Sequence, residues 1–133
     1  MRISFLLPLP PRELSPNFNS PWAPKAKWFR INARKQYRRD VGLEVRQYVS
    51  GMWLRFLAQN PRLRLTETYY IAGRRKRDLR NLFAAFKAGE DGLVDAGILL
   101  GDDDSMLEHG PPRIERVKTK AEEGVRVIIE EIG

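Results

Sequence analysis

The 133-residue sequence predicts an α+β domain with a mixed β-sheet, two main helices and the element order β-α-β-α-β-β. Some short stretches are rich in Val, Ile, Thr and Tyr, and one of them alternates apolar and polar residues with a period of two, which is typical of strands. In two longer stretches, apolar residues recur at intervals of three and four, which is typical of helices with one buried face. The length fits a single domain spanning residues 1–133.

The first half of the chain predicts a strand, a loop and a helix. Residues 2–8 form the strand, which stops at a pair of prolines. Residues 12–32 mix prolines, Asn and Ser with aromatic residues, so we expect a long functional or flexible loop. Residues 33–58 predict a helix that ends before Pro61, where proline forbids continuation. Its expected apolar face is Tyr37, Val41, Val45, Tyr48, Val49, Met52, Trp53 and Phe56.

The second half predicts a strand, a helix and a hairpin. Residues 63–73 alternate as a strand does, and Gly73 ends it. Residues 79–96 predict the second main helix, with Leu82, Phe83, Phe86, Leu93 and Val94 toward the core. An apolar segment, residues 98–107, is interrupted by three aspartates. Residues 113–119 and 125–132 then predict a β-hairpin.

Composition excludes several classes of site. The chain has no cysteine, so disulfides and thiolate metal ligands are impossible. A single histidine, His109, argues against a zinc site built from histidines, and we expect any metal to be held by oxygen. No run of about 18 apolar residues is present. We therefore expect a soluble, cytoplasmic protein with no membrane partner.

Charge is divided unevenly along the chain. Residues 1–80 hold 18 Lys/Arg against 5 Asp/Glu, and residues 81–133 hold 6 against 12, so balances of +13 and −6 give the net charge of +7. A basic half of this size suggests an anionic polymer such as DNA, because Lys and Arg release counterions from phosphates. A solvated basic surface is the alternative.

One acidic residue, Asp78, stands inside the most basic run. Asp78 either caps the helix that starts at Leu79 or serves as one acid of a site that handles phosphate. The cations and the amide around it are candidate DNA contacts: Arg74, Arg75, Lys76, Arg77, Arg80 and Asn81. A second candidate DNA-binding set lies on the polar side of the first helix: Arg34, Lys35, Arg38 and Arg39.

Three further acids follow the second helix. Asp102, Asp103 and Asp104 would repel one another, whereas Mg²⁺, or Mn²⁺ in its place, prefers such carboxylate oxygens. Together with Asp78 they could hold a metal that hydrolyses a phosphodiester; a solvated acidic turn is the alternative. Lys87 either pairs with Asp91 one turn later or directs its charge at the reacting phosphate.

These motifs resemble the RusA family of Holliday-junction resolvases, which are Mg²⁺-dependent homodimeric endonucleases of bacteria and their phages. The matching segments are LPLPPRELSPN, RRKRDLRNL, KAGEDGLVDAGILLGDDDS and the closing hairpin, which together cover most of the chain. The resemblance implies a RusA-like fold, a homodimer and four-way DNA junctions as substrate.

The resemblance also assigns site residues. Asp78 matches the first catalytic Asp and Asn81 the Asn of the same motif, while Lys87 matches the helical Lys and Asp91 the helical Asp. Asp103 and Asp104 match the closing acidic pair, with Asp104 the chosen metal ligand. The implied catalytic set is Asp78, Lys87, Asp103 and Asp104, and the implied metal ligands are Asp78, Asp103 and Asp104.

One position departs from the family pattern. Arg80 stands where the family has the second Asp of its Asp-x-Asp motif. Either another acid such as Asp102 or Glu67 replaces that ligand, or the metal is held more weakly, or the protein binds junctions without cutting them. The sequence therefore supports a junction endonuclease first, a junction-binding protein without cleavage second, and a basic RNA- or protein-interaction domain third.

Overall fold

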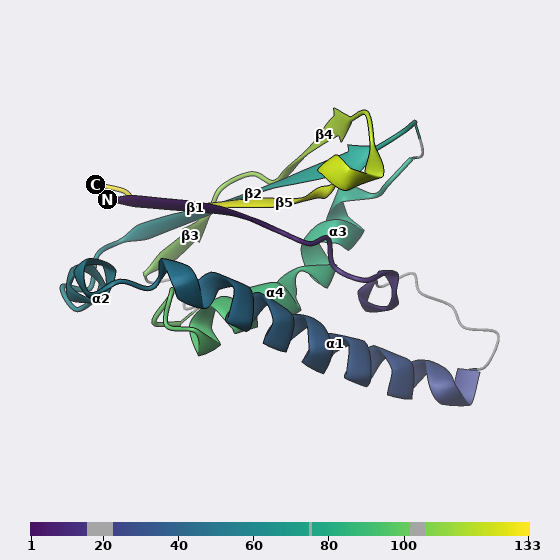
Figure 1. Cartoon of the computed structure of the whole chain (residues 1–133), viewed down its shortest axis with the longest axis horizontal. Coiled ribbons are helices and arrows are strands. Elements are labelled where there is room, and N and C mark those ends of the chain that lie inside the picture. Colours follow the sequence, from purple (N-terminus) through teal and green to yellow (C-terminus); the bar gives the residue numbers. More distant parts are fainter. Residues whose placement is uncertain (16–22, 75, 102–105) are drawn as a thin grey trace.

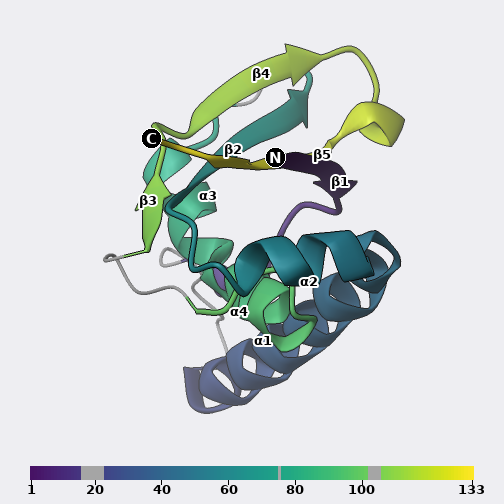
Figure 2. The same cartoon turned by 90° about the vertical axis from the view of Figure 1, so that its left-hand side faces the viewer.

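The computed structural model describes residues 1–15, 23–74, 76–101 and 106–133. It has an α+β architecture, as predicted: a mixed five-stranded sheet is covered on one face by helices α1, α2 and α4 (Figures 1 and 2). The strands are β1 (Arg2–Leu7), β2 (Leu63–Ala72), β3 (Leu107–His109), β4 (Arg113–Val117) and β5 (Gly124–Glu131). The helices are α1 (Ala23–Val45), α2 (Gly51–Leu57), α3 (Leu79–Ala85) and α4 (Lys87–Asp95), with short 3-10 turns η1 (Arg12–Leu14), η2 (Arg46–Tyr48) and η3 (Lys120–Glu122).

Strand β2 organises the sheet. It pairs antiparallel with β5 along one edge, and β1 extends the sheet beyond β5. Its other edge pairs in parallel with two short strands in succession, β3 beside residues 63–65 and β4 beside residues 68–72. The alternation of β2 turns Leu63, Leu65, Tyr69 and Ile71 into the core, where the inward residues of β5 meet them. The predicted strands 2–8 and 63–73 are confirmed to within one residue.

The predicted hairpin between residues 113–119 and 125–132 is wrong, because β2 lies between β4 and β5. A 3-10 turn, η3, carries the chain across the end of β2 from one edge to the other. Thr119 and Glu122 close this turn with a reciprocal capping box. The Glu123 carboxylate then accepts a hydrogen bond from the Ala72 backbone N–H at 2.8 Å, which ties the crossover to β2. Strand β3 was not predicted.

The predicted helix 33–58 is also wrong in its bounds. Helix α1 already starts at Ala23, so residues 23–32 are helical rather than loop, and Pro24 is compatible with a first turn because that turn needs no N–H. The chain then leaves the helical conformation at Val49 and Ser50. The Ser50 hydroxyl accepts from the Trp53 N–H at 3.1 Å and starts α2. The second predicted helix, 79–96, is confirmed in extent but divides at Phe86 into α3 and α4.

Helices α1 and α4 approach each other closely at Gly92. A Cβ added there would lie 2.5 Å from the Arg38 carbonyl oxygen and 3.1 Å from the Gly42 nitrogen, both of which are backbone atoms. Below this crossing, Val41, Phe86 and Leu93 are fully buried. None of the helices in the described residues combines the length and the hydropathy that a membrane span requires.

We expect Gly92→Ala to lower the free energy of unfolding by about 1–3 kcal/mol, since the added methyl must push two helix backbones apart. Urea unfolding followed by circular dichroism measures the loss. Gly51→Ala is the matched control, because a Cβ there meets only an Arg55 guanidinium nitrogen at 4.0 Å. Equal stability of Gly92→Ala and wild type would contradict this account of the crossing.

Candidate functional site

Asp78 caps helix α3. Its backbone is extended, and its Oδ1 accepts hydrogen bonds from the N–H groups of Arg80 at 2.8 Å and Asn81 at 3.4 Å. The capping interpretation of this residue is therefore confirmed. The cap uses one of the two carboxylate oxygens, and the residue remains exposed. Capping therefore leaves the side chain accessible to a ligand from solvent.

A hollow opens beside Asp78, which we call the Asp78 hollow. It has a volume of about 430 Å³ and is formed by two segments that are far apart in the sequence. The proline segment near the N-terminus and η1 form one wall, and the start of α3 forms the other. Its lining residues are Pro10, Pro11, Arg12, Ser15, Lys76, Arg77, Asp78, Asn81, Leu82 and Ala85. The structure thus brings together two of the segments that carry the family resemblance.

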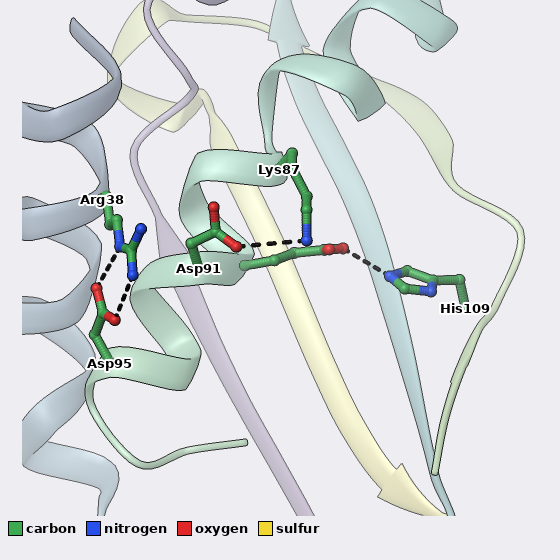
Figure 3. A network of polar contacts seen from close by, with 6 residues as sticks. Arg38, Lys87, Asp91, Asp95 and His109 are labelled. Atoms are coloured by element: carbon green, nitrogen blue, oxygen red, sulfur yellow. Dashed lines mark hydrogen bonds and ion pairs between the residues drawn. The ribbon is translucent and has the colours of Figure 1, made fainter. Parts of the chain in front are cut away.

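Lys87 and Asp91 lie in a neighbouring hollow. Lys87 Nζ is 3.4 Å from Asp91 Oδ1 across one turn of α4, so the predicted surface pair is present (Figure 3). This hollow is lined by Leu14, Arg34, Ala84, Ala85, Lys87, Ala88 and Asp91. Because Ala85 lines both hollows, Lys87 and Arg34 stand next to the Asp78 hollow rather than in a separate part of the fold.

The remaining candidate residues do not line the Asp78 hollow or lie outside the described residues. Arg74 and Arg80 are exposed beside the Asp78 hollow and do not line it. Arg75 and the acidic triplet Asp102, Asp103 and Asp104 lie outside the described residues, so their predicted roles stay predictions. The chain is described again from Met106, immediately before β3.

The basic side of α1 borders a third hollow. Lys35, Arg38, Arg39 and Arg46 line it together with Asp95 and Ala96 at the end of α4. Arg38 donates two hydrogen bonds to the Asp95 carboxylate, at 2.5 and 2.7 Å, and these bonds lower the pKa of Asp95 (Figure 3). Arg38 thus links α1 to α4, while Lys35 and Arg39 present their charges to solvent.

The structure also gathers three residues that sequence reasoning did not combine. Glu67 on β2, Glu90 on α4 and His109 on β3 offer ligand atoms that all lie within 4.8 Å of one another. His109 Nε2 is 2.8 Å from Glu90 Oε1 (Figure 3). We call this group the buried triad, because Glu67 and Glu90 are only 2% and 6% exposed. Of these three residues, the sequence points to Glu67 alone, as an acid that could replace the ligand missing at Arg80.

Burial dominates the electrostatics of the triad. Loss of water around Glu67, reinforced by the adjacent Glu90 carboxyl, raises the pKa of Glu67 to about 9. A hydrogen bond from the Tyr69 hydroxyl acts in the opposite direction but is weaker. Burial and the Glu67 charge also raise the pKa of Tyr37 and of Tyr69 above the ordinary value, so both remain neutral.

A signal for the triad exists in the sequence. The inward face of β2 reads Leu63, Leu65, Glu67, Tyr69 and Ile71, so one acid occupies a position that the alternation assigns to the core. Such a residue requires a partner. The partners could not be read from the sequence, because Glu90 and His109 reach Glu67 only through the packing of α4 and the parallel pairing of β3.

Comparison of the chain with protein-family models and with curated proteins finds no match.

Proposed function

We propose that the protein is a Mg²⁺-dependent, structure-selective endonuclease that cuts branched DNA, four-way junctions above all. The observation that carries the proposal is the composition of the Asp78 hollow. An exposed carboxylate shares an open cavity with Arg12, Lys76 and Arg77. Cations bind the phosphates of a DNA strand, and a carboxylate among them suits a divalent ion better than it suits phosphate alone.

The residues present are compatible with Mg²⁺. This ion commonly takes one or two carboxylates and keeps several waters, and Asp78 supplies one accessible carboxylate. Asp103 and Asp104 are the further ligands that the proposal requires. A bound Mg²⁺ would supply an activated water and stabilise charge on the phosphate.

The other side chains have roles that do not depend on the ion. Arg12, Lys76 and Arg77 hold the phosphate backbone without reading bases. The Asn81 amide, at the same wall of the hollow, can donate to a phosphate oxygen. Lys87 lines the hollow that adjoins at Ala85, and its role in this proposal is to stabilise the charge that develops on the leaving oxygen.

We also propose that the protein acts as a homodimer, since two sites related by a two-fold axis can nick opposed strands of a symmetric junction. The N-terminal part of α1 extends past the sheet (Figure 1). Trp28, Phe29 and Ile31 on this part are exposed, and apolar surface of this kind is typical of contacts between proteins. A second copy of the chain is the occupant that we propose for it.

In this proposal the basic side of α1 binds the duplex arms of the junction, so junction binding should depend on salt concentration through these residues. We expect the double variant Lys35→Ala/Arg39→Ala to weaken junction binding and to make the slope of log K against log salt shallower by about 2, because two phosphate contacts are lost. Fluorescence anisotropy over a salt series measures both quantities.

The control removes two charges elsewhere. Arg116→Ala/Lys118→Ala acts at β4 and the residue after it, and β4 is a strand at the edge of the sheet that lies away from α1 (Figure 1). It should leave the slope unchanged. Equal slopes for the α1 double variant and wild type would exclude this surface as the DNA contact.

A second candidate function is junction binding without cleavage. Two observations favour it: Asp78 already serves as a helix cap, and the exposed Arg80 puts a cation beside the hollow. Such a protein would keep the phosphate contacts and hold the metal too weakly to react.

Arg80→Asp separates the two candidates. An acid in the first turn of α3 is compatible with the helix, so the variant should fold. Nicking of a labelled junction in Mg²⁺ by wild type, faster in the variant, supports the endonuclease. Tight binding by wild type without any nick, followed by nicking in the variant, supports the binding protein. If neither protein nicks the junction, both the endonuclease and the deciding role of Arg80 are wrong.

A further inference from the structure

The buried triad lies in the core and shares no residue with the lining of the Asp78 hollow. Its ligand atoms are close enough together to bind one metal ion. Its three side chains come from three elements, β2, α4 and β3. Besides packing, the short β2–β3 ladder and the Arg64–Glu108 ion pair join β2 to β3. Ligands that share an ion at about 2.1 Å are about 3–4 Å apart. The triad, whose ligand atoms lie within 4.8 Å of one another, is already close to that arrangement.

One ligand atom of the triad is unsatisfied. Among the described residues, Glu67 Oε2 is buried and has no hydrogen-bond partner, although the side chain is almost completely enclosed. Buried polar atoms are normally paired, because an unpaired one costs about 1–3 kcal/mol. The neighbouring Glu90 carboxylate can only accept, so it cannot satisfy Oε2 unless one of the two carboxyls is protonated. Either a shared proton or a cation must therefore stand between them.

The surroundings are those of a metal centre rather than of an isolated acid pair. The Tyr69 hydroxyl donates a hydrogen bond to Glu67 Oε1, which orients the carboxylate and leaves Oε2 available as a ligand atom. The rings of Phe83 and His109 pack nearly perpendicular to each other, with centroids 5.8 Å apart, and this contact limits rotation of the imidazole. His109 is 27% exposed at its side chain, whereas Glu90 is 7% exposed, so the imidazole side offers the ion a route in from solvent.

From these contacts we propose that Glu67 Oε2, Glu90 Oε1 and His109 Nε2 bind a first-row divalent transition ion, with Zn²⁺, Mn²⁺ and Co²⁺ as the chemical class. One imidazole with two carboxylates is a mixed N/O donor set that such ions accept, while Mg²⁺ and Ca²⁺ select oxygen alone. The two carboxylates neutralise the charge of the ion inside the core. The ion replaces the His109–Glu90 hydrogen bond and fastens α4 to the β2–β3 edge of the sheet.

The test uses full-length protein freed of metal with a chelator and then titrated with Co²⁺, whose visible absorption reports its ligands. We expect a visible band at one equivalent. We also expect an unfolding temperature raised by at least about 5 °C when the ion is at a hundred times its dissociation constant. Mg²⁺ at the same concentration should not produce this shift.

Variants decide between an ion and a shared proton. Glu67→Gln and His109→Gln should each abolish the band and the temperature shift, and the partly exposed His109 provides a variant that folds if Glu67→Gln does not. Asp91→Asn, next to Glu90 but paired with Lys87 on the surface, should keep both responses. A wild type that shows no cobalt band, or a His109→Gln variant that keeps it, would overturn the proposal. Asp78→Asn must keep the band, so loss of junction cleavage and loss of the triad ion are separable results.

Discussion

Replacement of Asp78 by Asn should abolish junction cleavage while leaving the fold and junction binding intact. Asn caps a helix as well as Asp does, so the hydrogen bonds to the N–H groups of Arg80 and Asn81 persist. The charge that would hold Mg²⁺ is lost, and with it several kcal/mol of transition-state stabilisation. Because each 1.4 kcal/mol is a factor of ten in rate, we expect cleavage to fall by at least about 100-fold.

Comparison with Asp78→Ala separates the effect of the helix cap from the effect of the charge. It removes charge and cap together, so it should lose cleavage as completely and also lower the free energy of unfolding by about 1 kcal/mol. Single-turnover cleavage rates, binding by anisotropy and urea unfolding on the three proteins measure the separate effects. If Asp78→Asn cleaves at the wild-type rate, Asp78 serves only as a cap.

The free energy of unfolding of the metal-free protein should depend strongly on pH. In metal-free protein, we expect the free energy of unfolding to fall as pH rises from about 5 to about 9, by up to about 1 kcal/mol per pH unit. Native Glu67 keeps its proton up to a pKa of about 9, whereas in the unfolded chain it loses the proton near its ordinary value of 4.5. The native state therefore binds more protons in this window, so raising the pH favours unfolding. Asp95, whose pKa is lowered, contributes only below this window.

The groups that face Glu67 are Glu90 on α4, His109 on β3, Tyr69 on the same strand and Tyr37 on α1. Glu67→Gln keeps the shape of the protonated acid and removes its titration, so its stability should vary less with pH and exceed that of wild type at pH 8. Glu115→Gln on β4, at an exposed position, is the control and should keep the wild-type slope. Urea unfolding at intervals of one pH unit measures the slopes, and wild-type stability that stays flat or rises from pH 5 to 9 would contradict this description of the triad.

The parts of this fold that sequence could predict are those fixed by local chemistry. The alternation of β2 gave its bounds, and Asp78 before Leu79 gave the helix cap. The interruption between α1 and α2 also has a local cause, because Ser50 caps the start of α2. The apolar residues on both sides of it keep the helical spacing, so the sequence predicts one continuous helix. The prolines and polar residues around Ala23 are typical of a loop, so the sequence does not predict that α1 starts there.

What sequence could not predict depends on contacts between distant segments. Strands β4 and β5 are separated by a short connection that resembles a hairpin loop, and only the position of β2 between them shows otherwise. Strand β3 is three residues long and exists because β2 offers it an edge. The buried triad has the same origin, since Glu67, Glu90 and His109 are brought together by that edge and by the packing of α4.

The function that we propose for the Asp78 hollow is phosphodiester hydrolysis on branched DNA. Its most direct test is strand cleavage by wild-type protein in Mg²⁺, with a labelled four-way junction and a linear duplex of the same sequence at matched salt. We expect paired nicks in opposed strands of the junction, none in the duplex, and none in either substrate when a chelator replaces Mg²⁺. Uncut junctions in Mg²⁺, or equal cutting of junction and duplex, would contradict it.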